Sequence, residues 1–199
     1  MIYFSDVDVV LKLARCGFLP HLPELLGVTE DGISIQYLAS LKTRLTRPSK
    51  KLTNADYHKH LVEFCTAHQI IGAAADLTRQ EELLQSGMDP SEAILFAEAE
   101  ATGDKRALIH YAKHSTPAQR AKLKVVCWEQ LLLRVHQLKG YDELKRGACE
   151  ATADDGLLSL AFSSGLATQE AHALEAVRSY LKGVKSHSGD LLQLFDPDR

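Results

Sequence analysis

The chain has 199 residues, of which 45% are hydrophobic and 25% charged, an ordinary globular composition with enough length for one domain and a sizeable core. The net charge of −3 and the pI near 6.3 exclude a protein that binds nucleic acid through its overall charge, so such binding would need a local basic patch. No apolar run approaches the roughly 20 residues that span a bilayer, and the N-terminus lacks a basic-then-apolar signal pattern. We therefore expect a cytoplasmic protein without membrane contact.

Three segments predict buried strands. Residues 2–5 are aromatic and β-branched, residues 33–37 alternate between apolar and polar side chains, and residues 124–128 read Lys-Val-Val-Cys-Trp. Apolar residues at helical spacing predict helices over 7–16, 22–26, 38–45, 55–68, 79–86, 91–99, 105–113, 129–137, 142–150 and 168–183.

Strands separated by helices are typical of a three-layer α/β domain with a small, mainly parallel sheet. The helical share is large, above all in the C-terminal part of the chain. We expect residues 1–165 to form one domain, with residues 166–199 adding a helix and a tail that pack on it.

Three carboxylates stand at the starts of apolar, helix-like runs. Asp6 separates the first strand from the first helix, Glu92 lies in Asp-Pro-Ser-Glu-Ala-Ile-Leu, and Asp104 lies in Thr-Gly-Asp-Lys-Arg-Ala-Leu. If folding brings such residues together, their oxygens make a pocket that suits Mg²⁺ or Mn²⁺. In the competing interpretation each acid is an ordinary helix cap or first-turn charge, favoured there by the helix dipole.

In their order along the chain, these motifs resemble the PIN-domain nuclease superfamily, whose members share a small parallel sheet flanked by helices. Asp6 is similar to the aspartate of the family's opening signature, which reads strand-Asp-x-(Ser/Asn)-hydrophobic. Asp8 stands at the position where that signature has a small polar residue. Glu92 resembles the glutamate of the Gly-Glu-Ala motif of PIN-like branches, Asp104 resembles their third acidic motif, and Asp155 could offer a fourth acid. The likeness spans most of residues 1–165, although each motif is short.

The resemblance implies a metal-dependent nuclease, with RNA as the favoured substrate. Asp6, Glu92 and Asp104 would be the catalytic residues and would hold Mg²⁺ or Mn²⁺, with Asp8 and Asp155 as further ligands. A role as the toxin of a toxin–antitoxin pair, with an antitoxin-like protein partner, is one form of this hypothesis, and a homodimer is left open.

The sequence departs from the family pattern in two places. No acid follows the second strand in residues 37–41, and only twelve residues separate Glu92 from Asp104. Either the strand that usually precedes Asp104 is two or three residues long, near 101–102, or the sheet is trimmed. These departures support an alternative, a PIN-like binding or assembly module without catalysis. A third hypothesis is an unrelated helix-rich interaction protein in which the acids are caps.

Basic side chains gather in one part of the chain, where a nucleic-acid backbone could bind. The run has no acid within it and consists of Lys42, Arg44, Arg47, Lys50 and Lys51. Lys105 and Arg106, beside Asp104, are further candidates for phosphate contact, and Tyr37 and Tyr57 are candidates for base stacking. Solvated charges and simple packing of the two tyrosines are the competing interpretations.

Overall fold

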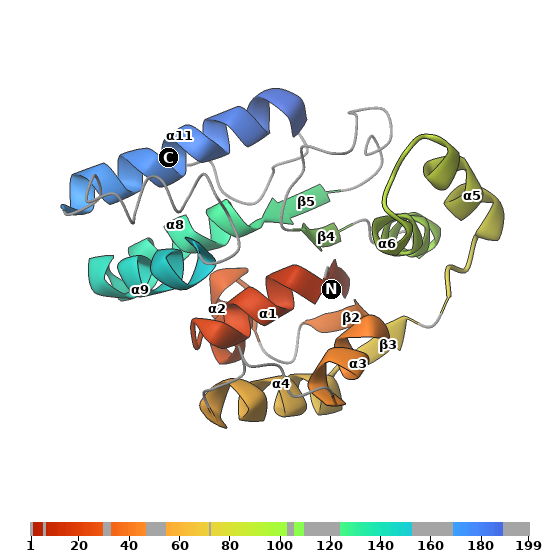
Figure 1. Ribbon diagram of the computed structural model, residues 1–199, viewed down its shortest axis with the longest axis horizontal. Coiled ribbons are helices and arrows are strands. Elements are labelled where there is room, and N and C mark those ends of the chain that lie inside the picture. The colour runs from red at the N-terminus through yellow and green to blue at the C-terminus, as the bar shows by residue number, and fades with distance from the viewer. Residues whose placement is uncertain are drawn as a thin grey trace.

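In the computed structural model, five strands form one parallel sheet in the order β3-β2-β1-β4-β5 (Figure 1). The strands are β1 (Ile2–Ser5), β2 (Ser34–Leu38), β3 (Gln69–Ile71), β4 (Arg106–Ile109) and β5 (Lys124–Cys127). The structure describes residues 2–5, 7–29, 33–46, 55–71, 73–102, 106–109, 124–152 and 169–188. The predicted α/β class, with a small parallel sheet among many helices, is confirmed.

Helices surround this sheet, and none in the described ranges is both long and apolar enough to cross a bilayer. A short 3₁₀ turn at Leu19–His21 leads into α2. The helices are α1 (Val7–Arg15), α2 (Leu22–Leu25), α3 (Ser40–Thr46), α4 (Ala55–Ala67), α5 (Leu77–Gln85), α6 (Pro90–Ala101), α8 (Trp128–Lys139), α9 (Tyr141–Thr152) and α11 (Glu170–Ser188). Helix α6 packs against β1, β2 and β4, whereas α11 packs on α8.

Helix α1 is buried along most of its length. Val9, Val10 and Leu13 have no exposed surface, which is typical of a helix that is covered on several sides. The helix ends at Arg15, and just beyond it Gly17 has a positive φ of 72°, which allows the Phe18 amide to donate a hydrogen bond to the Leu13 carbonyl at 2.7 Å. The helix predicted over 7–16 thus ends within one residue of its expected bound.

Tyr37 is fully buried in β2. Its hydroxyl donates a hydrogen bond to the Cys65 carbonyl at 3.1 Å, and its ring centre lies 5.5 Å from that of Phe64 on α4. Tyr57 is also buried in the core. Of the two interpretations of Tyr37 and Tyr57, simple packing is therefore confirmed and base stacking is wrong, because neither ring is accessible.

Around β3 and β4 the observed elements differ from those predicted from the sequence. The sequence predicted no strand at Gln69–Ile71, and it predicted a helix over 105–113 where Arg106–Ile109 is a strand. The short strand expected near residues 101–102 is also wrong, because α6 continues to Ala101 and Thr102 is its C-cap. The fourth strand thus follows Asp104 in the chain instead of preceding it.

The buried hydroxyl of Tyr37 gives a prediction for stability. Burial, and after it the hydrogen bond to Cys65, raises the pKa of Tyr37 above its ordinary value. At neutral pH we expect Tyr37→Phe to lower the free energy of unfolding by about 1 kcal/mol, because the hydrogen bond is lost. A tyrosine of the unfolded chain ionises near pH 10, so above that pH the wild type loses stability that the variant keeps. Urea unfolding should show that the difference in free energy of unfolding between the wild type and the variant is smaller at alkaline than at neutral pH. A difference that stays constant would contradict this prediction.

Candidate functional site

The strand order creates a switch point between β1 and β4. From β1 the chain adds β2 and β3 on one side, and then β4 and β5 on the other. Ser5 of β1 lies beside Leu108 of β4, which lies beside Val126 of β5, so the three strands end within one residue of the same level. In open parallel sheets, ligands bind in the crevice at the carboxyl ends of the strands on either side of such a point.

Buried polar side chains gather in the elements at this edge. Within the described ranges, the buried polar or charged residues are Ser5, Lys12, Glu129 and Gln130. Ser5 ends β1, Lys12 lies in the helix that follows it, and Glu129 and Gln130 open the helix that follows β5. A charge is costly to bury without compensating charges or hydrogen bonds, so this edge is the candidate functional site.

Contacts bring α1 to the start of α8. The Lys12 ammonium lies 6.0 Å from the centre of the Trp128 ring, within the range of a cation–π contact. The Cys127 amide donates a hydrogen bond to the Gln130 side chain at 3.0 Å, which fixes the first turn of α8. Burial, and after it the negative charge of Glu129, holds the pKa of the Cys127 thiol well above its ordinary value. The edge thus combines a buried cation, a buried carboxylate and a protonated thiol.

The structure describes part of the predicted acidic site. Glu92 is half-buried in the first turn of α6, the helix that packs on β1, β2 and β4, while Asp8 is exposed in the first turn of α1. Asp6, Asp104 and Asp155 lie outside the described residues. Among the residues that are described, no three His, Cys, Asp or Glu side chains are grouped so that they could hold a metal ion.

The predicted basic run begins on α3, which follows β2 after Ala39. Lys42 is exposed on this helix. Only the backbone is described for Arg44 and for Arg106, the first residue of β4. The remaining basic candidates lie outside the described residues and are Arg47, Lys50, Lys51 and Lys105.

Two charged residues of the edge, Glu129 and Lys12, were missed as site candidates in the sequence. Glu129 was detectable, since it is an acid two positions after the end of β5, and Asp6, which was predicted, directly follows the end of β1. Lys12 carries a weaker signal, because a lysine within an amphipathic helix usually reaches solvent.

No protein-family model matches the chain, and a comparison with curated proteins found no relative. Among solved structures, one chain of a Rickettsia felis crystal structure, described as VapBC2 bound to a DNA fragment from their promoter, is similar to this protein. It is 18% identical, the match covers 64% of this chain and 99% of that one, and the TM-score is 0.46. Because the TM-score is below 0.5, we base no argument on this likeness.

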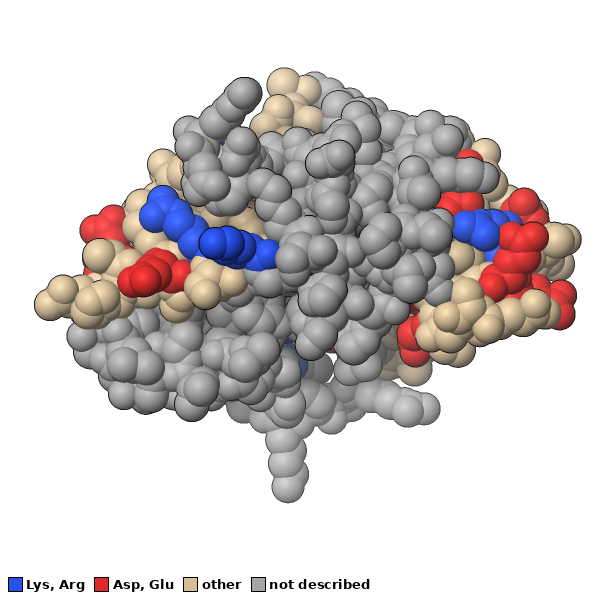
Figure 2. All heavy atoms as spheres, turned by 90° about the horizontal axis from the view of Figure 1, so that it is seen from above, with Lys and Arg blue, Asp and Glu red and all other residues tan. Residues whose placement is uncertain are grey.

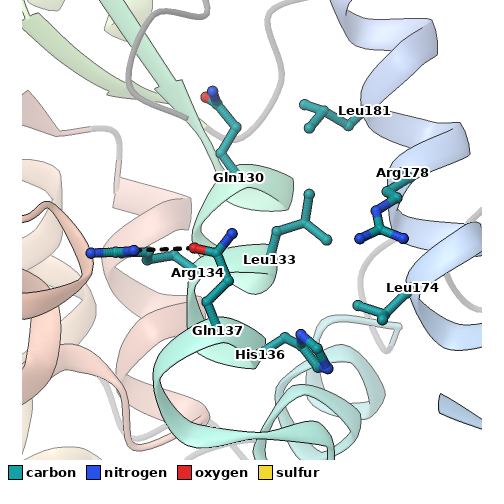
Figure 3. A pocket seen from close by; sticks show the side chains of 8 residues that line it. All are labelled: Gln130, Leu133, Arg134, His136, Gln137, Leu174, Arg178 and Leu181. Atoms are coloured by element: carbon teal, nitrogen blue, oxygen red, sulfur yellow. Dashed lines mark hydrogen bonds between the residues drawn. The ribbon is translucent and has the colours of Figure 1, made fainter. Parts of the chain in front are cut away.

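A surface pocket between α8 and α11 lies among residues that the sequence did not predict as functional (Figure 3). Leu133, Leu174 and Leu181 line it together with Arg178, which reaches from α11 toward α8. Its His136 is already paired with Glu170, at 2.6 Å between Nε2 and Oε1. The pocket contains none of the predicted carboxylates, and it shares one residue, Gln130, with the candidate site.

The burial of Lys12 gives a prediction about the charge of this edge. Lys12→Met keeps most of the apolar stem and removes the charge. If Lys12 compensates the buried carboxylate of Glu129, we expect the variant to lower the free energy of unfolding by about 3 kcal/mol, because that carboxylate then stays buried without a counter-charge. The matched control is Lys59→Met, whose ion pair with Glu63 at 3.9 Å is on the surface and should contribute less than about 1 kcal/mol. Equal effects of the two variants in chemical denaturation would contradict a compensating role for Lys12.

Proposed function

We propose that this protein is a PIN-like, divalent-metal-dependent nuclease, with RNA as the favoured substrate and its site at the switch point between β1 and β4. The observation that supports the proposal most is the gathering of buried polar side chains beside that point, with Glu129 fully buried at the start of α8. Asp6 joins β1 to α1 in the chain, and Glu92 opens a helix packed on the same strands.

In this proposal, Asp6, Glu92 and Glu129 hold Mg²⁺ or Mn²⁺, with Asp8 and Asp155 as outer ligands. When bound, the metal would activate a water molecule and stabilise the charge that develops on the phosphate. In the chain, Asp6 stands between β1 and α1, and the two glutamates belong to the first turns of α6 and α8. Asp104, the third acid predicted from the sequence, is left out of this set, because a residue at the carboxyl edge of β4 would follow Ile109 instead of preceding Arg106.

The positive charge near the site would serve the substrate. Helix α3 leaves β2 at its carboxyl end and carries Lys42 on its exposed surface. In the proposal, the basic run that begins there follows the sugar–phosphate backbone of the substrate. The predicted phosphate contacts of Lys105 and Arg106 are not part of it, because Arg106 opens β4 and so lies away from the carboxyl edge.

A second candidate function is a PIN-like binding module that has lost catalysis. Lys12 favours it, because a buried ammonium at the acidic edge could supply the positive charge that a metal ion would otherwise provide. The absence of an acid in residues 37–41, where β2 ends and α3 begins, points the same way.

Titration with Mn²⁺ distinguishes the two functions without knowledge of the substrate. For the nuclease, we expect saturable binding by calorimetry, and we expect Asp6→Asn and Glu129→Gln each to weaken it at least about tenfold, since each removes a charged ligand. Asp104→Asn tests whether the third predicted acid belongs to the set. Without metal, Asp6→Asn should leave the fold as stable or more stable, because one repelling carboxylate is removed.

The matched control is Glu63→Gln, which removes an exposed carboxylate on α4, far along the chain from the proposed ligands. It should bind Mn²⁺ as the wild type does. If the wild type shows no saturable binding, or if Glu63→Gln weakens binding as much as the ligand variants, the nuclease proposal fails and the binding module is favoured.

A further inference from the structure

Helix α5 is held to the rest of the protein mainly by its contact with α6 (Figure 1). Of its nine residues, Leu83 alone is buried. A helix that buries one side chain leaves most of its surface available. The outer side of α5 is therefore available to a partner.

The outer surface of α5 carries two exposed leucines. Leu77 is 65% exposed and Leu84 is 38% exposed. They are seven residues apart, which is about two helical turns, so they lie on the same face. Glu81 lies between them on that face, is exposed, and makes no hydrogen bond or ion pair within the described residues. We call Leu77, Glu81 and Leu84 the leucine face.

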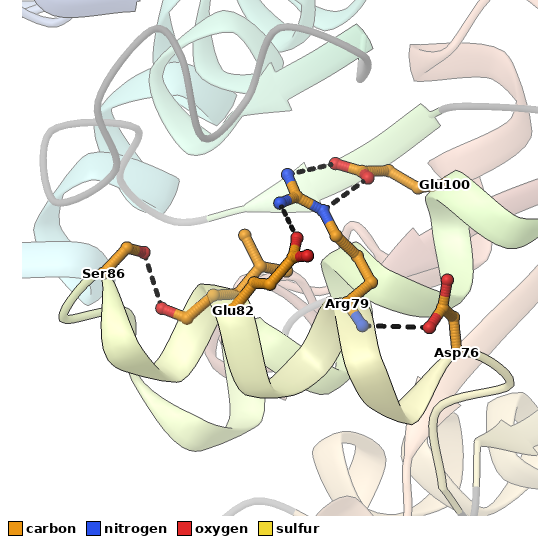
Figure 4. Close-up of polar contacts among 6 residues, drawn as sticks. Asp76, Arg79, Glu82, Ser86 and Glu100 are labelled. Atoms are coloured by element: carbon orange, nitrogen blue, oxygen red, sulfur yellow. Dashed lines mark hydrogen bonds and ion pairs between the residues drawn. The ribbon is translucent and has the colours of Figure 1, made fainter.

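The leucine face is fixed in position by a polar clamp on the other side of α5 (Figure 4). The Arg79 side chain contacts Glu82 at 2.9 Å and Glu100 of α6 at 2.8 Å. Asp76 caps the helix by accepting a hydrogen bond from the Arg79 amide at 2.9 Å. A partner would therefore meet a surface that is already ordered, which reduces the entropy lost on binding.

The hairpin formed by α5 and α6 is strongly acidic. Residues 73–102 contain seven carboxylates and a single basic residue, Arg79. The whole chain has 26 acidic and 23 basic residues, so basic residues outnumber acidic ones outside this hairpin. Figure 2 shows Asp and Glu gathered at the end of the molecule that α5 and α6 form. The two leucines are thus surrounded by negative charge.

Exposed leucines within an acidic hairpin restrict the kind of partner that can bind the leucine face. Nucleic acid and an anionic membrane surface would be repelled, and a second copy bound through the same face would bring two acidic hairpins together. An apolar strip framed by carboxylates fits a helix that has leucine-like side chains on one face and lysines or arginines beside them. We propose that the leucine face of α5 binds a basic amphipathic helical segment of a partner protein.

The test uses the full chain and two labelled synthetic helical peptides. One peptide has leucines at helical spacing and lysines elsewhere, and the other has glutamate in place of every lysine. By fluorescence anisotropy we expect the lysine peptide to bind saturably and the glutamate peptide not to bind. The double variant Leu77→Ser/Leu84→Ser should weaken binding by about tenfold or more, because the buried apolar area is lost. Glu81→Lys should weaken it several-fold, and added salt should weaken it in the wild type.

Val62→Ser is the matched control, because Val62 is an exposed apolar residue, at 44%, on α4. It should leave peptide binding unchanged, and circular dichroism should show the wild-type helix content for every variant, since all the altered side chains are exposed. The proposal is overturned if the lysine peptide does not bind saturably or if both peptides bind equally. It is also overturned if the double variant binds like the wild type, or if Val62→Ser weakens binding as much as the double variant does.

Discussion

The fold depends on one constraint, that all five strands run in the same direction. Each connection must return across a face of the sheet, so helices cover the faces and the strands are buried. Polar side chains then concentrate at the edge where strands end and helices begin, because amide groups of the helices' first turns can satisfy them there. The positions of Ser5 and Glu129, at the ends of strands on either side of β4, follow from this constraint.

The sequence predicts the elements that are long or have a clear apolar pattern. It misses the short strands, which form only because they pair with neighbouring strands. Helices α4, α6 and α8 lie within one or two residues of their predicted bounds, because each has a full apolar face. Strand β3 has three residues, two of them exposed, so its pattern is too short to detect. Strand β4 follows Lys105 and lies in a stretch whose spacing also fits a helix. Its pairing with β1 and β5 decides between the two, and local sequence cannot show that pairing.

Some residues of the candidate site were named from the sequence and others were not. The first turn of α6 was found because Glu92 follows a proline and opens an apolar run. Lys12 was missed because a lysine is normally placed on the polar face of a helix. In α1, however, Val9, Val10, Leu11 and Leu13 leave little room for such a face. A helix that is apolar on nearly every side is buried, so a charge in its middle, as Lys12 is, becomes buried too and needs a compensating partner.

Helix α6 links the candidate site to the acidic hairpin. Glu92 lies in its first turn. Near its other end, Glu98 accepts a hydrogen bond from the Ala75 amide and Glu100 pairs with Arg79. The Glu100 side chain is only 8% exposed, so the ion pair with Arg79 compensates a carboxylate that water hardly reaches. This pair makes α5 and α6 behave as one unit. A partner bound to the leucine face would therefore act on the helix that carries Glu92. A ligand shifts an equilibrium between two states by no more than its difference in affinity for them. The partner would therefore change the site only if α6 could adopt two placements and the partner bound one of them more tightly.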